Sequence, residues 1–271
     1  MEIDGRIAVI TGAGSGIGQA LAEELGQNQV SGLALVDMSD GVQDVAEQVQ
    51  VQYPGLKACG FVGDVRDESF RRMVFDQANE RLGLPTICVP VAGITRDALT
   101  VKVDKQTGTA HMYPIDTFRE VMEVNLIAPI YWALEMIARI AQQRRREGKG
   151  RWDPDEHIQG TIIFIGSVSS LGNKGQISYA TAKAGLEGAA ATLMAEAIFH
   201  GVRTGVIHPG YTDTPMVQSL GEDFIEQNIL PQTQLRRLIR PGEIAHAICF
   251  MIQNSAVSGQ LWADAGWHPI A

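Results

Sequence analysis

The sequence predicts an α/β protein built on one doubly wound parallel sheet with helices on both of its faces. Short runs of β-branched and apolar residues alternate along the chain with longer stretches of helical spacing. Several short runs, such as TIIFIG at 161–166, are apolar throughout, which is typical of parallel strands buried on both faces. No fixed-period repeat and no Pro-, Gly- or Ser-rich linker divides the 271 residues, so we expect a single domain over 1–271.

The individual elements follow from the same two periodicities. Strands are predicted for the β-branched runs at 7–10, 33–37, 58–65, 87–93, 161–166, 204–209 and 259–263. Helices are predicted where apolar residues recur every three or four positions, at 19–25, 42–52, 67–82, 118–143, around 177–200 and around 241–252.

Two insertions interrupt this alternation. Residues 100–115 follow a strand and residues 143–160 precede one, so in a parallel sheet they lie at opposite ends. Ligands bind outside the carboxyl ends of strands in open α/β sheets, so only the first insertion is a candidate substrate element. The second is highly charged, and its Arg144–Arg146 run is expected to be a solvated loop.

Composition and charge exclude several classes of protein. The chain is 45% hydrophobic and 20% charged, which suits a globular protein with a sizeable core. Its net charge of −9 argues against nucleic acid or an anionic membrane as the main partner. Acidic residues stand where a signal peptide would be basic, and no apolar run is long enough to span a bilayer, so we expect a cytoplasmic protein.

Cysteines and histidines give no sign of a metal site. The three cysteines lie in apolar surroundings without CxxC or Cys/His spacing, which predicts buried free thiols. The six histidines are scattered singly. His208, in VIHPG near a predicted strand end, has no acid or second histidine at a metal-like spacing. We therefore expect no metal.

The glycine-rich turn TGAGSGIG at 11–18 predicts a dinucleotide site. Glycines let a main chain approach phosphate closely, and the N-terminal N–H groups of the following helix attract the pyrophosphate. The spacing departs from a strict G-x-G-x-x-G pattern, but a strand precedes the turn and a helix follows it. The candidate cofactor-binding residues of this turn are Gly12, Ser15, Gly16, Ile17 and Gly18.

Asp37 indicates which dinucleotide binds. It ends the second predicted strand about 20 residues after the glycines, where a carboxylate accepts hydrogen bonds from the adenosine ribose and repels the 2′-phosphate of NADP. No Lys or Arg occurs between Arg6 and Lys57 to neutralise such a phosphate. The predicted cofactor is NAD(H).

In these motifs the chain resembles the short-chain dehydrogenase/reductase family, a group of Rossmann-fold enzymes, and the resemblance extends over essentially its whole length. Further motifs fall in family order: Asp64-Val65, Ala92-Gly93, Asn125, Ser167, Tyr179-x-x-x-Lys183 and PGYTDT at 209–214. Within the family, AGITRDAL (92–99) and GSVSSLGNKGQISYATAKAGL (166–186) look most like 3-oxoacyl-acyl-carrier-protein reductases.

The resemblance implies a role for each of these residues. Asp64 and Val65 would contact the adenine, and Ala92 and Gly93 would line the cofactor. The segment that would hold the nicotinamide comprises Pro209, Gly210, Thr212 and Thr214. The catalytic group would be Asn125, Ser167, Tyr179 and Lys183, with Tyr179 and Lys183 also contacting the cofactor.

The chemistry of this group can be stated physically. Oxidising an alcohol requires hydride transfer and a base for the hydroxyl proton, and a free Tyr has a pKa of about 10. Lys183, one helical turn from Tyr179, is expected to lower that pKa together with the oxidised nicotinamide. Ser167 would hold the substrate oxygen, and Asn125 would support a proton-relaying water.

Structural alternatives exist for these residues. Ser167 is also a plausible helix N-cap, with Ser169 and Ser170 as rivals for its role, and Asn125 is also a plausible satisfied polar residue within a helix. Many relatives read NNAG where this chain has Pro90-Val91-Ala92-Gly93, which puts the local support of that loop in question.

The substrate and the assembly are less constrained. We expect a small-molecule secondary alcohol or ketone, with a 3-hydroxyacyl or 3-oxoacyl thioester as first choice and a polyol, sugar or steroid alcohol as alternatives. A non-catalytic dinucleotide sensor or an NAD-using lyase or epimerase is the alternative of another class. By resemblance, residues 213–238 form a lid, and the chain forms a homo-oligomer, a tetramer or dimer, through the long helix and the helix carrying Tyr179.

Overall fold

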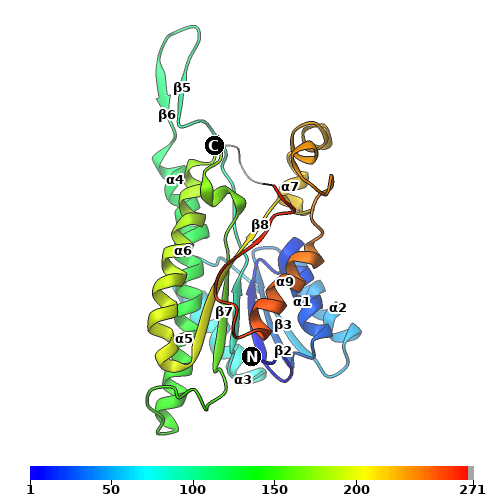
Figure 1. The fold of residues 1–271 in the computed structure, drawn as a ribbon, viewed down its shortest axis with the longest axis vertical. Coiled ribbons are helices and arrows are strands. Elements are labelled where there is room, and N and C mark those ends of the chain that lie inside the picture. Colours follow the sequence, from blue (N-terminus) through cyan, green and yellow to red (C-terminus); the bar gives the residue numbers. More distant parts are fainter. Residues whose placement is uncertain (268–271) are drawn as a thin grey trace.

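The computed structural model describes residues 1–267 and has a Rossmann-type α/β fold, as predicted (Figure 1). Over these residues the main sheet has seven strands in the order β3-β2-β1-β4-β7-β8-β9, and every pairing is parallel. The strands are β1 (Ile7–Thr11), β2 (Gly32–Asp37), β3 (Lys57–Val62), β4 (Ile87–Pro90), β7 (Gly160–Ile165), β8 (Val202–Pro209) and β9 (Gly259–Ala263).

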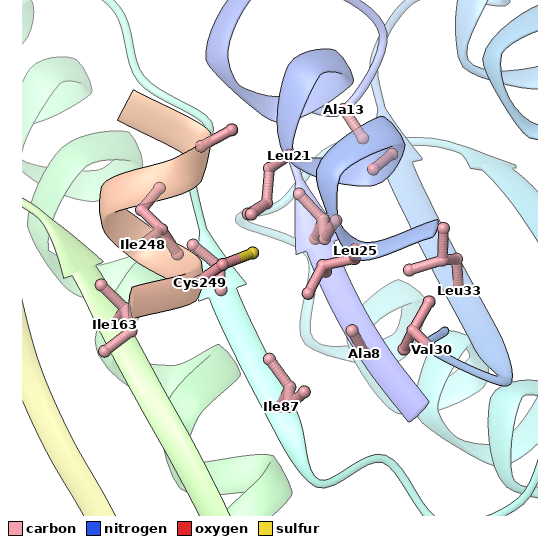
Figure 2. Packing of buried hydrophobic residues seen from close by; sticks show 14 of the residues in the cluster. Ala8, Ala13, Leu21, Leu25, Val30, Leu33, Ile87, Ile163, Ile248 and Cys249 are labelled. Carbon is pink, nitrogen blue, oxygen red and sulfur yellow. The ribbon is translucent and has the colours of Figure 1, made fainter. Parts of the chain in front are cut away.

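Helices cover both faces of this sheet. One layer holds α1 (Gly16–Gln27), α2 (Gly41–Gln52) and α9 (Pro241–Gln253), and the other holds α3 (Glu68–Arg81), α5 (Ala128–Arg146) and α6 (Ile177–Ala197). Alternate residues of a strand serve the two layers: Ala8 and Ile10 pack in the first core, whereas Val9 packs in the second. Figure 2 shows the first core, where Leu21 of α1 and Ile248 of α9 meet over the sheet. Burial on both sides explains why the strands are apolar throughout.

Two strands end earlier than the sequence predicts. The strand predicted at 58–65 ends at Val62, and the one predicted at 87–93 ends at Pro90. Proline has no N–H to continue the ladder, which accounts for the second ending. As a result Asp64 and Ala92 lie in loops beyond the carboxyl ends of their strands.

The predicted long helix is longer than 118–143 and contains an irregular turn. It consists of α4 (Ile115–Met122), a π-helical turn over Glu123–Ile127, and α5. Pro129, in the first turn of α5, has no N–H to donate to the carbonyl four residues earlier, that of Asn125. The wider turn is therefore located where the α-helical bond cannot form.

This helix also has the length and composition of a membrane span. Ile115–Arg146 is the one helix in the described part of the chain that meets that criterion, and 44% of its apolar window is buried. Trp132 and Met136 are fully buried against the sheet. Its apolar content is thus accounted for in part by packing in the protein core.

The first insertion forms a hairpin that projects from the body of the protein (Figure 1). Strands β5 (Val101–Val103) and β6 (Ala110–Met112) pair antiparallel, and Asp104 accepts main-chain hydrogen bonds in the turn between them. The side chains of Val101 and Met112 are 53% and 81% exposed. None of residues 100–115 lines either of the two cavities described below, so a role of this insertion in substrate binding stays a prediction.

The second insertion is not simply the solvated loop that its charges suggest. Arg144 is only 2% exposed, and its guanidinium donates to both carboxylate oxygens of Glu156 at 2.7 and 3.0 Å and to the Gly150 carbonyl at 3.1 Å. This ion pair closes the loop against the end of α5. As expected, the loop lies at the opposite end of the molecule from the hairpin (Figure 1).

The Arg144–Glu156 pair should make stability depend on pH. Hydrogen bonding to Arg144 lowers the pKa of Glu156 to about 2 from its ordinary 4.5. Because the folded pKa is depressed, the stabilisation is complete above pH 4.5 and is lost as pH falls toward 2. We expect Glu156→Gln to lower the urea midpoint at pH 7, with a smaller difference from the native protein at pH 3.5.

The exposed neighbour offers the control for this experiment. Asp155→Asn removes a similar charge from the same loop without touching Arg144 and should leave the midpoint nearly unchanged at both pH values. Equal effects of the two substitutions would contradict the role of the ion pair.

Candidate active site

The glycine turn after β1 leaves no room for side chains. A Cβ on Gly12, whose φ is +66°, would lie 2.7 Å from the Ala92 nitrogen, and a Cβ on Gly18 would overlap the Gly12 carbonyl. Gly16 also has a positive φ, +56°. Ser15 precedes α1 in an extended conformation, and its side chain makes no capping hydrogen bond. The turn therefore has the form of a cradle that opens at a helix N-terminus.

Asp37 at the end of β2 is tied to this turn. Its carboxylate accepts hydrogen bonds from the Gly14 N–H at 2.9 Å and from the Ser39 N–H at 3.0 Å. A Cβ on Gly14 would lie 3.0 Å from the Asp37 carboxyl carbon. The two bonds hold the carboxylate beside the glycine cradle.

A cavity of about 480 Å³ extends from the glycine turn to the helix α6. The predicted cofactor residues on its walls are Gly12, Ser15, Ile17, Asp37, Asp64, Val65, Ala92, Gly93, Tyr179, Lys183 and Thr214. Further lining residues that the sequence analysis did not single out include Met38, Arg66, Ile94, Arg96, Glu120 and Val124. Each of these residues lies within a few positions of a predicted strand end or of Asn125. Their closeness in sequence to these sites is the feature from which they could have been predicted.

Arg66 is the most consequential of these additions. Its guanidinium donates to both oxygens of Asp64, at distances down to 2.6 Å, and this hydrogen bonding lowers the pKa of Asp64. Trp132 of α5 donates its indole N–H to the Val65 carbonyl at 2.9 Å, which holds the loop after β3 against α5. Asp64 is thus an ionised, paired carboxylate at the cavity wall.

The loop beyond β4 is held by two side chains from other elements. The hydroxyl of Thr11 accepts from the Ala92 N–H at 3.2 Å. Asn125 is fully buried, and its amide accepts from the Ile94 N–H at 2.8 Å and donates to the Ile94 carbonyl at 2.7 Å. Both polar ends of the Asn125 side chain are therefore engaged in positioning this loop.

Lys183 is a buried ammonium group. The residue is 3% exposed, and its Nζ donates to the carbonyl of Ile165, the last residue of β7, at 2.8 Å. Burial lowers the pKa of Lys183 to about 8. The Nζ lies 5.6 Å from the centroid of the Tyr179 ring.

Tyr179 faces Ser167, but its pKa moves opposite to the expected direction. Desolvation raises the pKa of Tyr179 to about 12, and a hydrogen bond with Ser167 offsets only part of that rise. The expected lowering of this pKa relies on Lys183 together with an oxidised nicotinamide and stays a prediction. In the protein by itself the cost of burying a phenolate is the larger effect.

Ser167 has the structural role considered for it and also lies at Tyr179. Its hydroxyl accepts from the Ser169 N–H at 3.1 Å and so caps the 3₁₀ turn Val168–Leu171, and it also meets Tyr179. Of the rival serines, Ser170 lies 3.4 Å from the imidazole of His208. Ser167 is the serine that the structure brings to Tyr179.

A second cavity of about 220 Å³ lies on the other side of Tyr179. Ser167, Tyr179, Pro209 and Gly210 line it, together with apolar side chains of the segment 213–238, namely Met216, Val217, Leu220 and Phe224. Among the described residues, Tyr179 and Met216 alone line both this cavity and the larger one. The phenol therefore stands at the junction of the two.

Some predicted site residues contribute indirectly. Asn125 and Thr212 line neither cavity. Thr212 is 3% exposed and donates to the Gly210 carbonyl at 3.0 Å, whereas Thr214 lines the larger cavity and caps a short helix, α7 (Pro215–Gln218). Thr212 shapes the turn, and Gly16 and Gly18 shape the cradle.

The residues present fit a nicotinamide dinucleotide. The glycine cradle that any Cβ would fill suits the pyrophosphate, and the cavity continues past Asp37 on one side and to Lys183 on the other. This combination suits an oxidoreductase whose dinucleotide cleft lies next to a second, smaller cavity.

Comparison with known proteins agrees. The model of the short chain dehydrogenase family matches residues 6–224. A 3-oxoacyl-(acyl-carrier-protein) reductase from Pseudomonas aeruginosa is 33% identical over 257 residues, 94% of this chain and 93% of that protein. The reductase of the same name from Escherichia coli is 30% identical with the same coverage, and the short-chain reductase protein NovJ of Streptomyces niveus is 32% identical over 90% of this chain and 86% of its own.

The chain belongs to the short-chain dehydrogenase family. It is an oxidoreductase that acts on alcohol or ketone groups with a nicotinamide dinucleotide.

The buried Lys183 should give stability a second dependence on pH. Its folded pKa is about 8 against an ordinary 10.5, so the cost of burying the charge is full below pH 8 and disappears as pH rises toward 10.5. Relative to Lys183→Met, the native protein should gain about 2 kcal/mol of unfolding free energy between pH 7 and 9.5.

Denaturant unfolding at the two pH values measures this gain. Lys174→Met, which changes an exposed lysine of the neighbouring loop, should keep a constant difference from the native protein over the same range. A flat difference for Lys183→Met as well would show that Lys183 titrates normally.

Proposed function

We propose that the protein is an NAD(H)-dependent oxidoreductase that interconverts a secondary alcohol and a ketone, with Tyr179 as the general acid and base. The observation that carries this proposal is the position of Tyr179 on the wall shared by the two cavities. A proton donor at that junction can reach a substrate oxygen whose carbon faces the cofactor.

The chain's own residues divide the work. Ser167 and Tyr179, which line the same cavity, together bind the substrate oxygen. Tyr179 takes the hydroxyl proton in oxidation or returns it in reduction. Lys183 supplies a positive charge and a donor beside the Tyr179 ring, and Asn125 positions the loop that carries Ala92 and Gly93. When bound, the dinucleotide supplies the hydride acceptor or donor.

The raised pKa of Tyr179 bears on direction. A phenol with a pKa of about 12 is protonated at neutral pH, which suits donation to a ketone oxygen. Oxidation needs positive charge near the phenol to lower that pKa, and an oxidised nicotinamide carries such a charge. Both directions are therefore part of the proposal.

The preference for NAD rests on Asp37. Its carboxylate is held beside the glycine cradle on a cavity wall, where it would repel a ribose 2′-phosphate. Arg66 comes from the next strand's loop and lines the same cavity, but its guanidinium is bound to Asp64. The local charge pattern thus favours a free 2′-hydroxyl over a phosphate.

We propose a 3-hydroxyacyl or 3-oxoacyl thioester as the substrate. Relatives that bear the name 3-oxoacyl-(acyl-carrier-protein) reductase support this class. Met216, Leu220 and Phe224 give the substrate cavity an apolar wall, which suits an acyl chain or a steroid better than a polyol and supports the role of 213–238 as a lid. A screen of NAD reduction across hydroxyacyl-CoAs, polyols and hydroxysteroids tests the assignment, and turnover of polyols alone would refute it.

We further propose a homo-oligomer in the cytoplasm. Ile127, Tyr131 and Leu134 are exposed along one stretch of the long helix at 39%, 50% and 37%, which supports its pairing with a second copy. The net charge of −9 is in keeping with a cytoplasmic enzyme without a nucleic-acid or membrane partner.

Removing the phenol hydroxyl should abolish turnover without affecting cofactor binding. We expect Tyr179→Phe to lower kcat by about 10²–10⁴-fold, since proton transfer loses its donor, while the Kd for NADH stays nearly unchanged. Tyr53→Phe, at the end of α2 and outside both cavities, is the control and should keep native kinetics. Unimpaired turnover in Tyr179→Phe would sink the mechanism.

Asp37 should set the choice between the two dinucleotides. Fluorescence titrations should give tighter binding of NADH than of NADPH to the native protein. Asp37→Ala should narrow the ratio of the two Kd values about tenfold or more, because a charge repulsion is removed. Asp40→Ala, three residues on at an exposed site, should leave the ratio unchanged, and a native preference for NADPH would contradict the proposal.

A further inference from the structure

His208 is a fully buried titratable residue that the proposed chemistry does not use. It is the penultimate residue of β8, at the carboxyl end of the strand next to β7, and its side chain has no exposed surface. Buried imidazoles need hydrogen-bond partners or a reason to lack them. The partners of the His208 imidazole include Ser167, a residue of the candidate active site.

The imidazole contacts the main chain of Ser167. The regular pairing of β7 with β8 ends where the Gly166 N–H donates to the Ile207 carbonyl at 2.7 Å, since Pro209 has no N–H to continue it. One residue further on, the Ser167 N–H donates to Nδ1 of His208 at 3.3 Å, and the Ser167 carbonyl lies 3.2 Å from the same atom. The His208 side chain thus contacts the main chain after β7, just beyond the last hydrogen bond between the two strands.

The ring is clamped between two strands. A Cβ on Gly166 would lie 2.5 Å from Nδ1, so the ring occupies the space of a side chain at that position. On the neighbouring strand β9, Trp262 stacks on the imidazole with ring centroids 4.2 Å apart and an angle of 13° between the planes. This packing leaves the ring little freedom to rotate away from Ser167.

The other end of the ring has weaker contacts. Nε2 is buried without a hydrogen bond and lies 3.9 Å from a carboxylate oxygen of Glu187, whose second oxygen accepts from Gln260 at 3.1 Å. Burial lowers the pKa of His208, and the neutral ring carries one N–H. With that hydrogen on Nε2, the nitrogen on the Glu187 side, Nδ1 accepts from the Ser167 N–H. The close contacts are thus concentrated on Nδ1.

We propose that His208 is a positioning residue, which fixes the main chain of Ser167 through Nδ1 and so presents the serine hydroxyl to Tyr179 and the substrate oxygen. This inference rests on the proposed function for its catalytic consequence. The hydrogen bond and the packing that it invokes do not depend on which alcohol is the substrate.

Three substitutions separate hydrogen bonding from space filling. The amide of His208→Asn lies where Nδ1 is, that of His208→Gln lies where Nε2 is, and His208→Phe keeps a ring without either nitrogen. If Nδ1 fixes Ser167, the Asn variant should be closest to the native protein in amide exchange and in kcat, although its side chain fills the least space. A purely packing role predicts the opposite order.

Hydrogen exchange followed by mass spectrometry provides a readout that is independent of activity. Amides of peptides covering 160–176 should exchange about fivefold faster in the Gln and Phe variants, the factor that corresponds to one lost hydrogen bond, and within about twofold of native in the Asn variant. Equal or better protection in the Phe variant would overturn the proposal.

Kinetics test the catalytic consequence with the substrate that the NAD-reduction screen identifies. We expect kcat to stay closest to native in the Asn variant and to be lower in the Gln and Phe variants. KM should change less than kcat, and the Kd for NADH should stay constant. A native protein that turns over no alcohol defeats the proposed function, and the exchange pattern still decides whether His208 fixes Ser167. Faster exchange without any loss of kcat in an active enzyme would overturn the positioning role.

Discussion

The carboxyl ends of β4 and β7 lie inside the protein, and the main chain there needs hydrogen-bond partners that the parallel sheet does not supply. Side chains from other elements supply them. Asn125 pairs both main-chain groups of Ile94 beyond β4, and Lys183 donates to Ile165 at the end of β7. The residues proposed for catalysis therefore also complete the main-chain hydrogen bonding at the carboxyl ends of these strands.

This double role ties the geometry of the site to the stability of the fold. An unpaired polar group in the interior costs about 1–3 kcal/mol, so Asn125 and Lys183 are held in place by the main chain that they serve. Burial lowers the pKa of Lys183 to about 8 and raises that of Tyr179 to about 12, which keeps the phenol protonated at neutral pH beside an ammonium that is still mostly charged. The site is arranged before a ligand arrives, at an electrostatic cost met by the surrounding packing.

The sequence predicted the sheet, its covering helices and the order of the site residues, but it missed features that depend on contacts across the chain. Strand ends near the site were placed too late, because apolar letters continue beyond the last paired residue at Val62 and Pro90. Arg144 looked solvated because its partner, Glu156, lies across a loop whose path local patterns do not give. The π-helical turn around Asn125 follows from Pro129, a local signal that the apolar periodicity of the long helix concealed.

By itself, the sequence determined the fold class, the glycine cradle and the spacing of Tyr179 and Lys183, because periodicity, glycine conformation and helical neighbours are local properties. Only the tertiary structure decided which atoms meet there. Register between β7 and β8 brings His208 to Ser167 across 41 residues, and the convergence of the two cavities puts Tyr179 on a shared wall. Burial likewise raises the pKa of Tyr179 in the protein by itself, because desolvation depends on the atoms that surround a group, and a spacing along a helix does not specify them.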